Sequence, residues 1–250
     1  MFKLTINLTF IISLFWSNFS WAENVDLEGF SKNQKWEEVT SEEGLTVYTT
    51  EIPNSKLLGF KLTGTVDADV TSLMSNIRDV ERSTEWTPEL LVKQTIKNIS
   101  DIEAITYSVN DLPWPLDDRD FILHNKLHLS KDKKLLFVIS KSIQHKDYPN
   151  KNKLVRAWIH YSNMGLRPLG PNKTYVEWTL FGDPKGNIPA WLVNFYQSGF
   201  PIKFFLMARN RANSVRLPML TGLKIMLNDL NNLLKEKLNK TKDITTSSLP

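Results

Sequence analysis

The chain has 250 residues, of which 41% are hydrophobic and 23% charged, and this balance excludes an intrinsically disordered or fibrous protein. Lys and Arg (31) exceed Asp and Glu (27) only slightly, and the excess is spread along the chain, so the charge pattern does not indicate nucleic-acid binding. The absence of cysteine excludes disulfides, thiolate metal sites, a cysteine nucleophile and a lipid-modified cysteine. An aromatic content of 11% points instead to an apolar or stacking ligand surface.

Residues 1–22 have the pattern of a secretory signal peptide. Lys3 precedes an uncharged, mostly apolar run that ends in Ser20-Trp21-Ala22, a small-x-small cleavage pattern. An uncleaved membrane anchor is the alternative, because the run is just long enough to cross a bilayer. Polar residues interrupt the run and favour cleavage near Ala22. A domain without disulfides is ordinary in the bacterial periplasm, so we expect a periplasmic or secreted protein.

The chain that follows predicts an antiparallel sheet with a helix inserted early. Short alternating or β-branched runs predict strands over 45–52, 57–66, 91–99, 103–109, 121–129, 135–142, 154–163 and 174–181. Between the second and third strands, apolar residues at helical spacing predict a helix over 69–80, with Asp67 or Asp69 as its N-cap. We expect this helix to continue loosely to Trp86, before Pro88.

Two helical segments close the sequence. The first begins at Pro189, and we expect an interruption at Gly199-Phe200-Pro201, because proline removes a helical hydrogen bond, before the helix resumes and ends ahead of Pro218. A leucine stripe predicts an additional amphipathic helix over 218–240, followed by a disordered tail over 241–250. This leucine helix either packs on the domain or uses its lysine-bearing face to bind a membrane surface or a partner protein.

Two segments resemble the sequence signatures of START lipid-transfer domains. Residues 112–122 (LPWPLDDRDFI) are similar to the Pro-Trp-Pro and Arg-Asp signature of that family, and residues 186–194 (GNIPAWLVN) resemble the start of its C-terminal helix. The resemblance implies an α+β helix-grip fold of the START/Bet v 1-like type, in which a curved antiparallel sheet wraps a long C-terminal helix and encloses one hydrophobic cavity. We therefore expect a lipid-binding domain over 23–217.

In such a fold one face of each strand lines the cavity, which gives a set of candidate ligand-binding residues. Alternation along 121–129 predicts that Phe121, Leu123 and Asn125 point inward, and Tyr107 is assigned to the same face on a less decisive pattern. The loop residues Trp114 and Pro115 and the helix residues Leu192, Phe195, and Gly199 or Phe200 are expected at the cavity mouth. An ordinary hydrophobic core is the alternative explanation of the helix residues.

Arg119 has two interpretations. It could meet a lipid head group inside the cavity, or it could hold the Trp114 loop through a salt bridge and backbone hydrogen bonds. Some sterol-carrying START domains have a second arginine six residues further on, where this chain has Asn125. That difference argues against a charged site for a sterol hydroxyl.

No pattern in the chain predicts a metal site, a cofactor or a catalytic centre. His124 and His128 would lie about 13 Å apart on a strand and so cannot share an ion. The expected function is non-catalytic binding and transfer of a single hydrophobic lipid, a phospholipid, sterol or similar molecule, with transient contact to membrane surfaces and none to nucleic acid. The alternatives are an enzyme acting on a hydrophobic substrate in the same cavity and a lipid-responsive sensor that signals to a partner protein through the C-terminal helix.

Overall fold

The computed structural model describes residues 34–53, 55–114, 116–132, 134–150 and 153–247, with side chains described in these ranges except at 191, 195–197 and 237–247. The predicted signal peptide, Pro115 and the side chain of Phe195 therefore lie outside the described residues. The described part forms a single compact unit that begins at Gln34.

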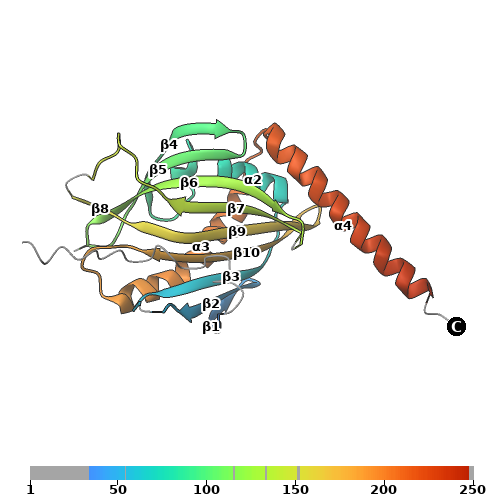
Figure 1. Ribbon diagram of the computed structural model, residues 1–250, viewed down its shortest axis with the longest axis horizontal. Helices are drawn as coiled ribbons and strands as arrows, with labels where there is room; N and C mark the ends of the chain where they lie inside the picture. Colours follow the sequence, from blue (N-terminus) through green and yellow to red (C-terminus); the bar gives the residue numbers. More distant parts are fainter. Residues whose placement is uncertain (1–33, 54, 115, 133, 151–152, 248–250) are drawn as a thin grey trace, which may run out of the picture. The chain divides into compact units, whose positions relative to one another are not determined.

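One large sheet dominates this unit (Figure 1). Its strands are β1 (Glu37–Glu42), β2 (Leu45–Glu51), β3 (Leu58–Val66), β4 (Leu90–Ser100), β5 (Glu103–Asn110), β6 (Asp118–Ser130), β7 (Leu135–Ser142), β8 (Leu154–Arg156), β9 (Trp158–Gly170) and β10 (Lys173–Asp183). They are ordered β1-β2-β3-β10-β9-β7-β6-β5-β4, and every pair along this path is antiparallel. The short strand β8 instead pairs in parallel with the start of β6.

Three α-helices and one 3-10 turn lie in the described chain: α2 (Val70–Arg78), η1 (Ser83–Glu85), α3 (Ala190–Ser214) and α4 (Thr221–Ser247). Asp69 is the N-cap of α2, and its carboxylate accepts a hydrogen bond from the backbone N–H of Ser72 at 2.9 Å. α3 packs on β1, β2 and β3 and against α2. The helix-grip architecture expected from the sequence is thus the one observed.

The main hydrophobic core lies between the inner face of the sheet and the helices. Leu45, Leu62 and Val176 from the sheet are fully buried, as is Phe205 from α3. Trp178 of β10 lies at the centre of an aromatic cluster, with ring centroids 5.3 Å from both Phe60 and Phe204. Each fully buried side chain of this size contributes about 1.5–3 kcal/mol, so these residues fix α3 on the sheet.

A second, smaller cluster covers the outer face of the sheet. Tyr107 and Val109 of β5 and Ile122 of β6 are buried there, with Tyr148 and Leu154 packed against them. The ring centroids of Tyr107 and Tyr148 are 5.2 Å apart. Part of the sheet is therefore buried on both faces, a feature that becomes important for assigning the cavity-lining residues.

Several element boundaries differ from the sequence-based expectation. β1 was not predicted, because its residues EEVTSE are almost all exposed and show no apolar alternation. The expected strand 154–163 is divided at Ala157 into β8 and β9, and β9 continues to Gly170. α2 ends at Arg78, and only the short turn η1 follows before Pro88.

The two C-terminal helices also differ from expectation. α3 is continuous through Pro201, so the predicted interruption at Gly199-Phe200-Pro201 is wrong; Phe204 and Phe205 hold the following turns in the core. α4 continues to Ser247, so residues 241–247 are helical and not part of a disordered tail. No proline or glycine occurs between Gly222 and Pro250 to end it earlier.

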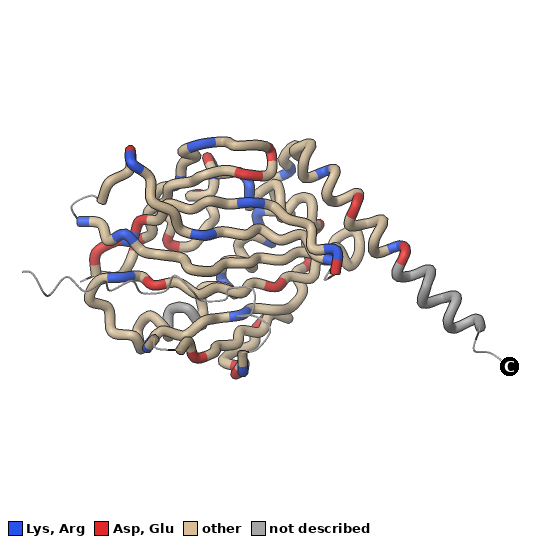
Figure 2. The backbone as a smooth tube through the Cα atoms, viewed as in Figure 1, with Lys and Arg blue, Asp and Glu red and all other residues tan. Residues whose placement is uncertain are grey.

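The N-terminal half of α4 packs on the domain. Leu223, Leu227 and Leu230 are buried in the main core, and the Lys134 ammonium donates a hydrogen bond to the carbonyl of Leu233 at 3.2 Å. The rest of α4 extends beyond the ends of β6 and β7 (Figure 1). Acidic and basic residues are interspersed along the strands and the first turns of α4 (Figure 2). None of the helices, over the residues that the structure describes, combines the length and apolar character needed to span a bilayer.

Candidate ligand cavity

A cavity of about 800 Å³ lies between the sheet and the helices. Its walls come from the inner faces of β4, β5, β6, β7, β9 and β10, from α2 and α3, and from the linker between α3 and α4. This volume falls within the range of sites that enclose most of a small-molecule ligand. The cavity adjoins β4, the edge strand furthest from the part of the sheet that α3 covers.

Most of the cavity wall is apolar. The apolar side chains are drawn from every surrounding element and include Met74, Ile77, Leu123, Met164, Trp178, Leu180, Phe200 and Phe204. Phe200 and Phe204 extend from α3 toward Trp178, at centroid distances of 6.3 and 5.3 Å. Methionine and aromatic side chains can adjust to irregular hydrocarbon shapes, so this wall suits an alkyl or ring-system ligand.

A row of polar side chains crosses the floor of the cavity. Asn125 of β6 donates through Nδ2 to Thr106 Oγ1 at 3.0 Å and to the Leu123 carbonyl at 3.1 Å, and its Oδ1 accepts from Ser140 Oγ at 2.7 Å. The strand register explains the row, because Asn125 lies opposite Ser140 on β7. Thr106 accepts one of these bonds and retains its own hydroxyl hydrogen for another acceptor.

Basic side chains lie at the α2 and β4 side of the cavity. Lys93 of β4 and Arg78, the last residue of α2, both line it. Burial and, secondarily, the nearby Arg78 guanidinium lower the pKa of Lys93 to about 8. The Arg78 guanidinium donates to Asn98 Oδ1 at 3.0 Å, which ties the end of α2 to β4.

A second cavity of about 190 Å³ lies beneath the loop between β5 and β6. It is bounded by that loop, by the segment between β10 and α3 and by the first turns of α3, including Leu192. Phe121, Leu180 and Phe200 line both cavities. These side chains therefore separate the large cavity from the small one.

Arg119 holds two loops together at the small cavity. Its guanidinium donates to the backbone carbonyl of Asp117, to that of Pro184 at 3.0 Å and to that of Lys185 at 2.9 Å. Gly186, at φ +70°, is required beside it, since a Cβ there would strain the backbone and lie 3.1 Å from Arg119 Nη2. These are the backbone hydrogen bonds that the structural interpretation of Arg119 expects, and contact with a lipid head group stays a prediction.

Asp120 bonds to a residue that sequence reasoning did not single out. Its two carboxylate oxygens accept from Nε and Nη2 of Arg156, each at 2.8 Å. The Asp120 side chain is 1% exposed and lies on the outer face of the sheet with Tyr107. Burial and the neighbouring Asp120 raise the pKa of Tyr107 to about 12.

The structure divides the expected ligand-binding residues into three groups. Phe121, Leu123, Asn125 and Phe200 line the large cavity, and Arg119 and Leu192 line the small one. Trp114 is 92% exposed and lines neither cavity, and Gly199 is exposed with no atom within 4 Å of an added Cβ.

The assignment of Tyr107 to the cavity is wrong. Tyr107 lies opposite Ile122 in the register of β5 and β6, and both belong to the outer cluster. The polar residues Thr106 and Ser108 face the cavity in its place. The sequence pattern of β5 did not show that its outer face is also covered.

The residues of α2 and β4 that line the cavity were also missed. The sequence predicted α2 as a helix without assigning its apolar stripe to a cavity, and Lys93 occurs in a strand with weak alternation. The irregular pairing of β4 with β5, with shifts near Leu90, Thr95 and Asn98, explains this weak pattern.

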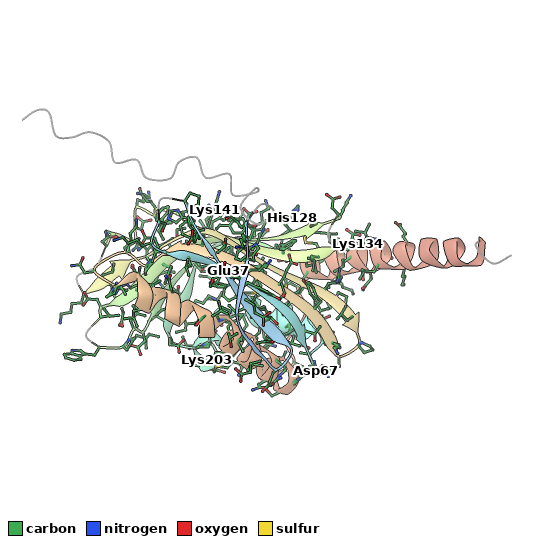
Figure 3. All side chains as sticks on the ribbon, turned by 90° about the horizontal axis from the view of Figure 1, so that it is seen from below. Glu37, Asp67, His128, Lys134, Lys141 and Lys203 are labelled. Carbon is green, nitrogen blue, oxygen red and sulfur yellow. The ribbon has the colours of Figure 1, made fainter. Side chains whose placement is uncertain are left out.

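The histidines lie away from the cavity. His124 Nε2 is 2.7 Å from Glu103 Oε1, and the hydrogen bonds to His124 and Lys126 lower the pKa of Glu103. His128 and Lys141 extend from the side of the sheet opposite α3 (Figure 3). Across the described ranges, no group of three or more His, Cys, Asp or Glu side chains is arranged to hold a metal ion.

Comparison with known proteins places this architecture in one family. The profile described as START domain matches residues 17–216. An uncharacterised protein of Pseudomonas aeruginosa is 26% identical over 179 residues, covering 72% of this chain and 87% of that protein. The phosphatidylcholine transfer protein of Mus musculus is 24% identical over 163 residues, covering 64% of this chain and 75% of that protein.

Solved structures share the fold. Human STARD10 superimposes with a TM-score of 0.66 at 21% identity, covering 75% of this chain and 78% of its own. A fragment of a STAR-related lipid transfer protein from Xanthomonas axonopodis gives a TM-score of 0.63 at 24% identity, covering 72% of this chain and 99% of that fragment. The sheet and α3 enclose a cavity, and the family profile covers most of the sequence. The chain therefore belongs to the START domain family.

Proposed function

We propose that this protein binds one lipid molecule in the large cavity and carries it between membranes without changing it chemically. The observation that supports this most directly is the cavity of about 800 Å³, lined mainly by apolar side chains and crossed by one polar row. Membership of the START domain family supports the same role, and one relative is a phosphatidylcholine transfer protein.

Burial of the acyl chains in the cavity supplies enough free energy for such a carrier. Burial of roughly 400 Å² of acyl surface at about 25 cal/mol per Å² yields about 10 kcal/mol, which offsets much of the cost of leaving a bilayer. Because the membrane offers a similar apolar environment, transfer is close to neutral in free energy. The protein accelerates it by removing the passage of the acyl chains through water.

The charged and polar groups at the cavity favour lipid binding over catalysis. The Asp79 carboxylate is bound to Arg82 at 2.7 Å, and Glu81 and Asp101 are exposed at the rim. The central polar groups are hydroxyls and the Asn125 amide, which hydrogen-bond to one another. Such groups orient a ligand, and they do not form an acid–base pair.

We further propose that the carrier works in the periplasm after cleavage near Ala22. The uncharged run ending in Ser20-Trp21-Ala22 supports this location. Expression of the full chain in a Gram-negative bacterium, followed by fractionation and intact-mass measurement, should recover a protein beginning at Glu23 in the periplasmic fraction. Retention of residues 1–22 in the membrane pellet would replace the shuttle by a tethered carrier.

Native mass spectrometry of protein purified without detergent tests the carrier itself. We expect one intact lipid per protein, together with protein-dependent movement of fluorescent phospholipid from donor to acceptor vesicles. Ala104→Trp, which projects an indole from β5 into the cavity, should abolish both, whereas Lys97→Trp on exposed β4 should not. An empty wild-type protein, or one that releases a chemically altered lipid, would refute the proposal.

A further inference from the structure

The α2 and β4 side of the large cavity combines charge with an apolar surround. Lys93 lies opposite Ser108 in the register of β4 and β5, and Ser108 lies opposite Phe121 in the register of β5 and β6. All three side chains line the cavity, so the register forms a row that changes from a cation through a hydroxyl to an aromatic ring. Directly opposed residues have Cβ atoms about 5 Å apart, which makes this row continuous.

The ammonium of Lys93 is not neutralised by a carboxylate of the described chain. Its pKa is lowered by burial and by Arg78, with no acidic side chain opposing either effect. At about 8, this pKa leaves the group mostly cationic at neutral pH. A partly buried cation without a counter-ion is costly, so the site favours a ligand that supplies the negative charge.

Arg78 adds a second cation from the opposite wall. One nitrogen of its guanidinium bonds to Asn98, which leaves the other N–H groups of a five-donor fork for further acceptors. The cavity also has acidic residues at its rim, but Asp79 pairs with Arg82, and Glu81 and Asp101 do not contribute to the pKa of Lys93. The positive charge is thus concentrated where α2 faces β4.

We infer that the cavity selects an amphiphile with an anionic head group, which binds between Lys93 and Arg78 while the hydrocarbon follows the wall formed by Leu123, Trp178 and Phe204. This inference rests on the proposed lipid-binding function and adds the chemical class of the ligand. A phosphodiester and a carboxylate satisfy the same chemistry, since each presents oxygens that accept charge-assisted hydrogen bonds.

Competition between vesicle lipids tests this selectivity on the full-length wild-type protein. The protein is incubated with vesicles containing equal amounts of phosphatidylglycerol and phosphatidylcholine of identical acyl chains, separated from the vesicles and examined by native mass spectrometry. We expect bound phosphatidylglycerol to exceed phosphatidylcholine on the order of tenfold. A parallel incubation with oleate distinguishes a carboxylate ligand from a phosphodiester.

Lys93→Met preserves length and apolar contact but removes the charge. It should reduce the preference for phosphatidylglycerol to near unity, and Lys93→Arg should retain the preference. Lys97→Met is the matched control, because Lys97 is exposed on the same strand and lies opposite Ile105 of the outer cluster. Arg78→Gln provides a second test should the first variant fold poorly.

The outcomes separate this inference from the function on which it rests. Lipid bound at one-to-one stoichiometry without a charge preference, or an equal preference in wild type and a folded Lys93→Met, would refute the anionic site and leave lipid carriage intact. Absence of any bound lipid, whether phosphatidylglycerol, phosphatidylcholine or oleate, would refute both. Preference for oleate over both phospholipids would support the site and identify a carboxylate as its ligand.

Discussion

Arg119 and Asp120 are adjacent in the chain, yet they stabilise opposite faces of the sheet. Arg119 points to the helix side and donates to three carbonyls of two loops. Asp120 points to the outer face, where Arg156 binds both of its oxygens. A strand alternates its side chains, so one dipeptide can anchor two separate layers. Folding therefore accounts for both members of the Arg-Asp pair in the motif.

Arg119→Ala should lower stability and leave ligand selectivity unchanged. The variant leaves carbonyls of Asp117, Pro184 and Lys185 without their donor, and we expect a loss of about 2–3 kcal/mol in the free energy of unfolding. Urea unfolding measures this loss. Arg209→Ala is the control: its partner Glu43 is half exposed, so the loss should stay below about 1 kcal/mol. Equal stabilities of the two variants would contradict the role assigned to Arg119.

Lys93 should give stability a pH dependence in the alkaline range. The pKa of Lys93 is about 8 in the folded protein, against 10.5 for an ordinary lysine. Between these values the unfolded chain binds more protons than the folded one, so the free energy of unfolding rises with pH. Among the charged groups lining the cavity, only Arg78 shifts this pKa; Asp79, Glu81, Arg82, Asp101 and Lys126 do not.

Urea unfolding of the lipid-free protein at pH 7.5 to 10.5 measures this dependence. Subtraction of the Lys93→Met profile isolates the contribution of Lys93, because every other titrating group remains in both proteins. We expect the difference between wild type and variant to change across this interval and to be flat below it. A constant difference would mean that Lys93 is solvated like a surface lysine.

The cavity-lining residues could be predicted from sequence only where one face of a strand is clearly distinguished. On β6, Phe121, Leu123 and Asn125 line the large cavity, in agreement with the alternation along that strand. On β5, Tyr107 and Val109 form the more apolar face, but Ile143, Tyr148 and Leu154 cover that face from outside. Because alternation reports burial and not the side from which burial comes, no single-strand pattern could have revealed that Thr106 and Ser108 face the cavity.

At the scale of elements, α3 shows that tertiary packing can override a local helix breaker. Pro201 removes one hydrogen bond within the helix, yet Ile202, Phe204 and Phe205 are buried directly after it. Burial of three large apolar side chains outweighs the cost of about 3 kcal/mol for an internal proline. β1 also forms against its local sequence. Its polar residues carry no strand signal, but its backbone pairs with β2 at the sheet edge.

Gly199→Ala should stabilise the protein. Gly199 lies inside α3 without a positive φ, and an added Cβ would meet no atom within 4 Å. We expect a gain of about 0.5–1 kcal/mol, because alanine loses less backbone entropy than glycine in a helix. Thermal unfolding measures the change.

Gly222→Ala is the matched control in α4. There the added Cβ would lie 2.6 Å from Ile102 Cγ2, so the same substitution should destabilise the protein. A loss of stability in Gly199→Ala would contradict this expectation. A lower rate of lipid transfer at unchanged stability would indicate that α3 bends at residues 199–201 during transfer.

At the scale of the whole described unit, the cavity exists because α3 covers only part of the sheet. α3 packs on β1, β2 and β3, whereas the inner faces of β4, β5, β6 and β7 line the cavity. The resemblance of two segments to START signatures implied this helix-grip architecture. That resemblance could not predict the offset of the helix, which depends on which aromatic side chains meet Trp178.

This arrangement leaves two regions at which lipid could enter. One is the small cavity beneath the loop between β5 and β6, separated from the large one by Phe121 and Phe200. The other is the gap between the end of α2 and the β4–β5 turn, where Glu81 and Asp101 are exposed at the rim of the large cavity. Entry by the first route requires the loop and the first turns of α3 to separate.

Crosslinking can identify the entrance, because the chain has no native cysteine. Leu112→Cys with Leu192→Cys places one thiol on the loop and one on α3, both at the small cavity. We expect a flexible bismaleimide bridging them to stop lipid exchange while the protein stays folded and retains a preloaded lipid. Exchange is measured by transfer of fluorescent phospholipid between vesicles, and each singly modified protein is the control for labelling itself.

The second pair, Glu81→Cys with Asp101→Cys, should leave exchange at the wild-type rate when bridged in the same way. Both residues are exposed and line the rim of the large cavity, so the bridge closes only the gap between α2 and the β4–β5 turn. If this bridge stops exchange and the bridge from Leu112 to Leu192 does not, lipid enters beside β4. In that case the head group would pass Arg78 and Lys93 on its way in, and the loop that carries Trp114 would have no part in gating.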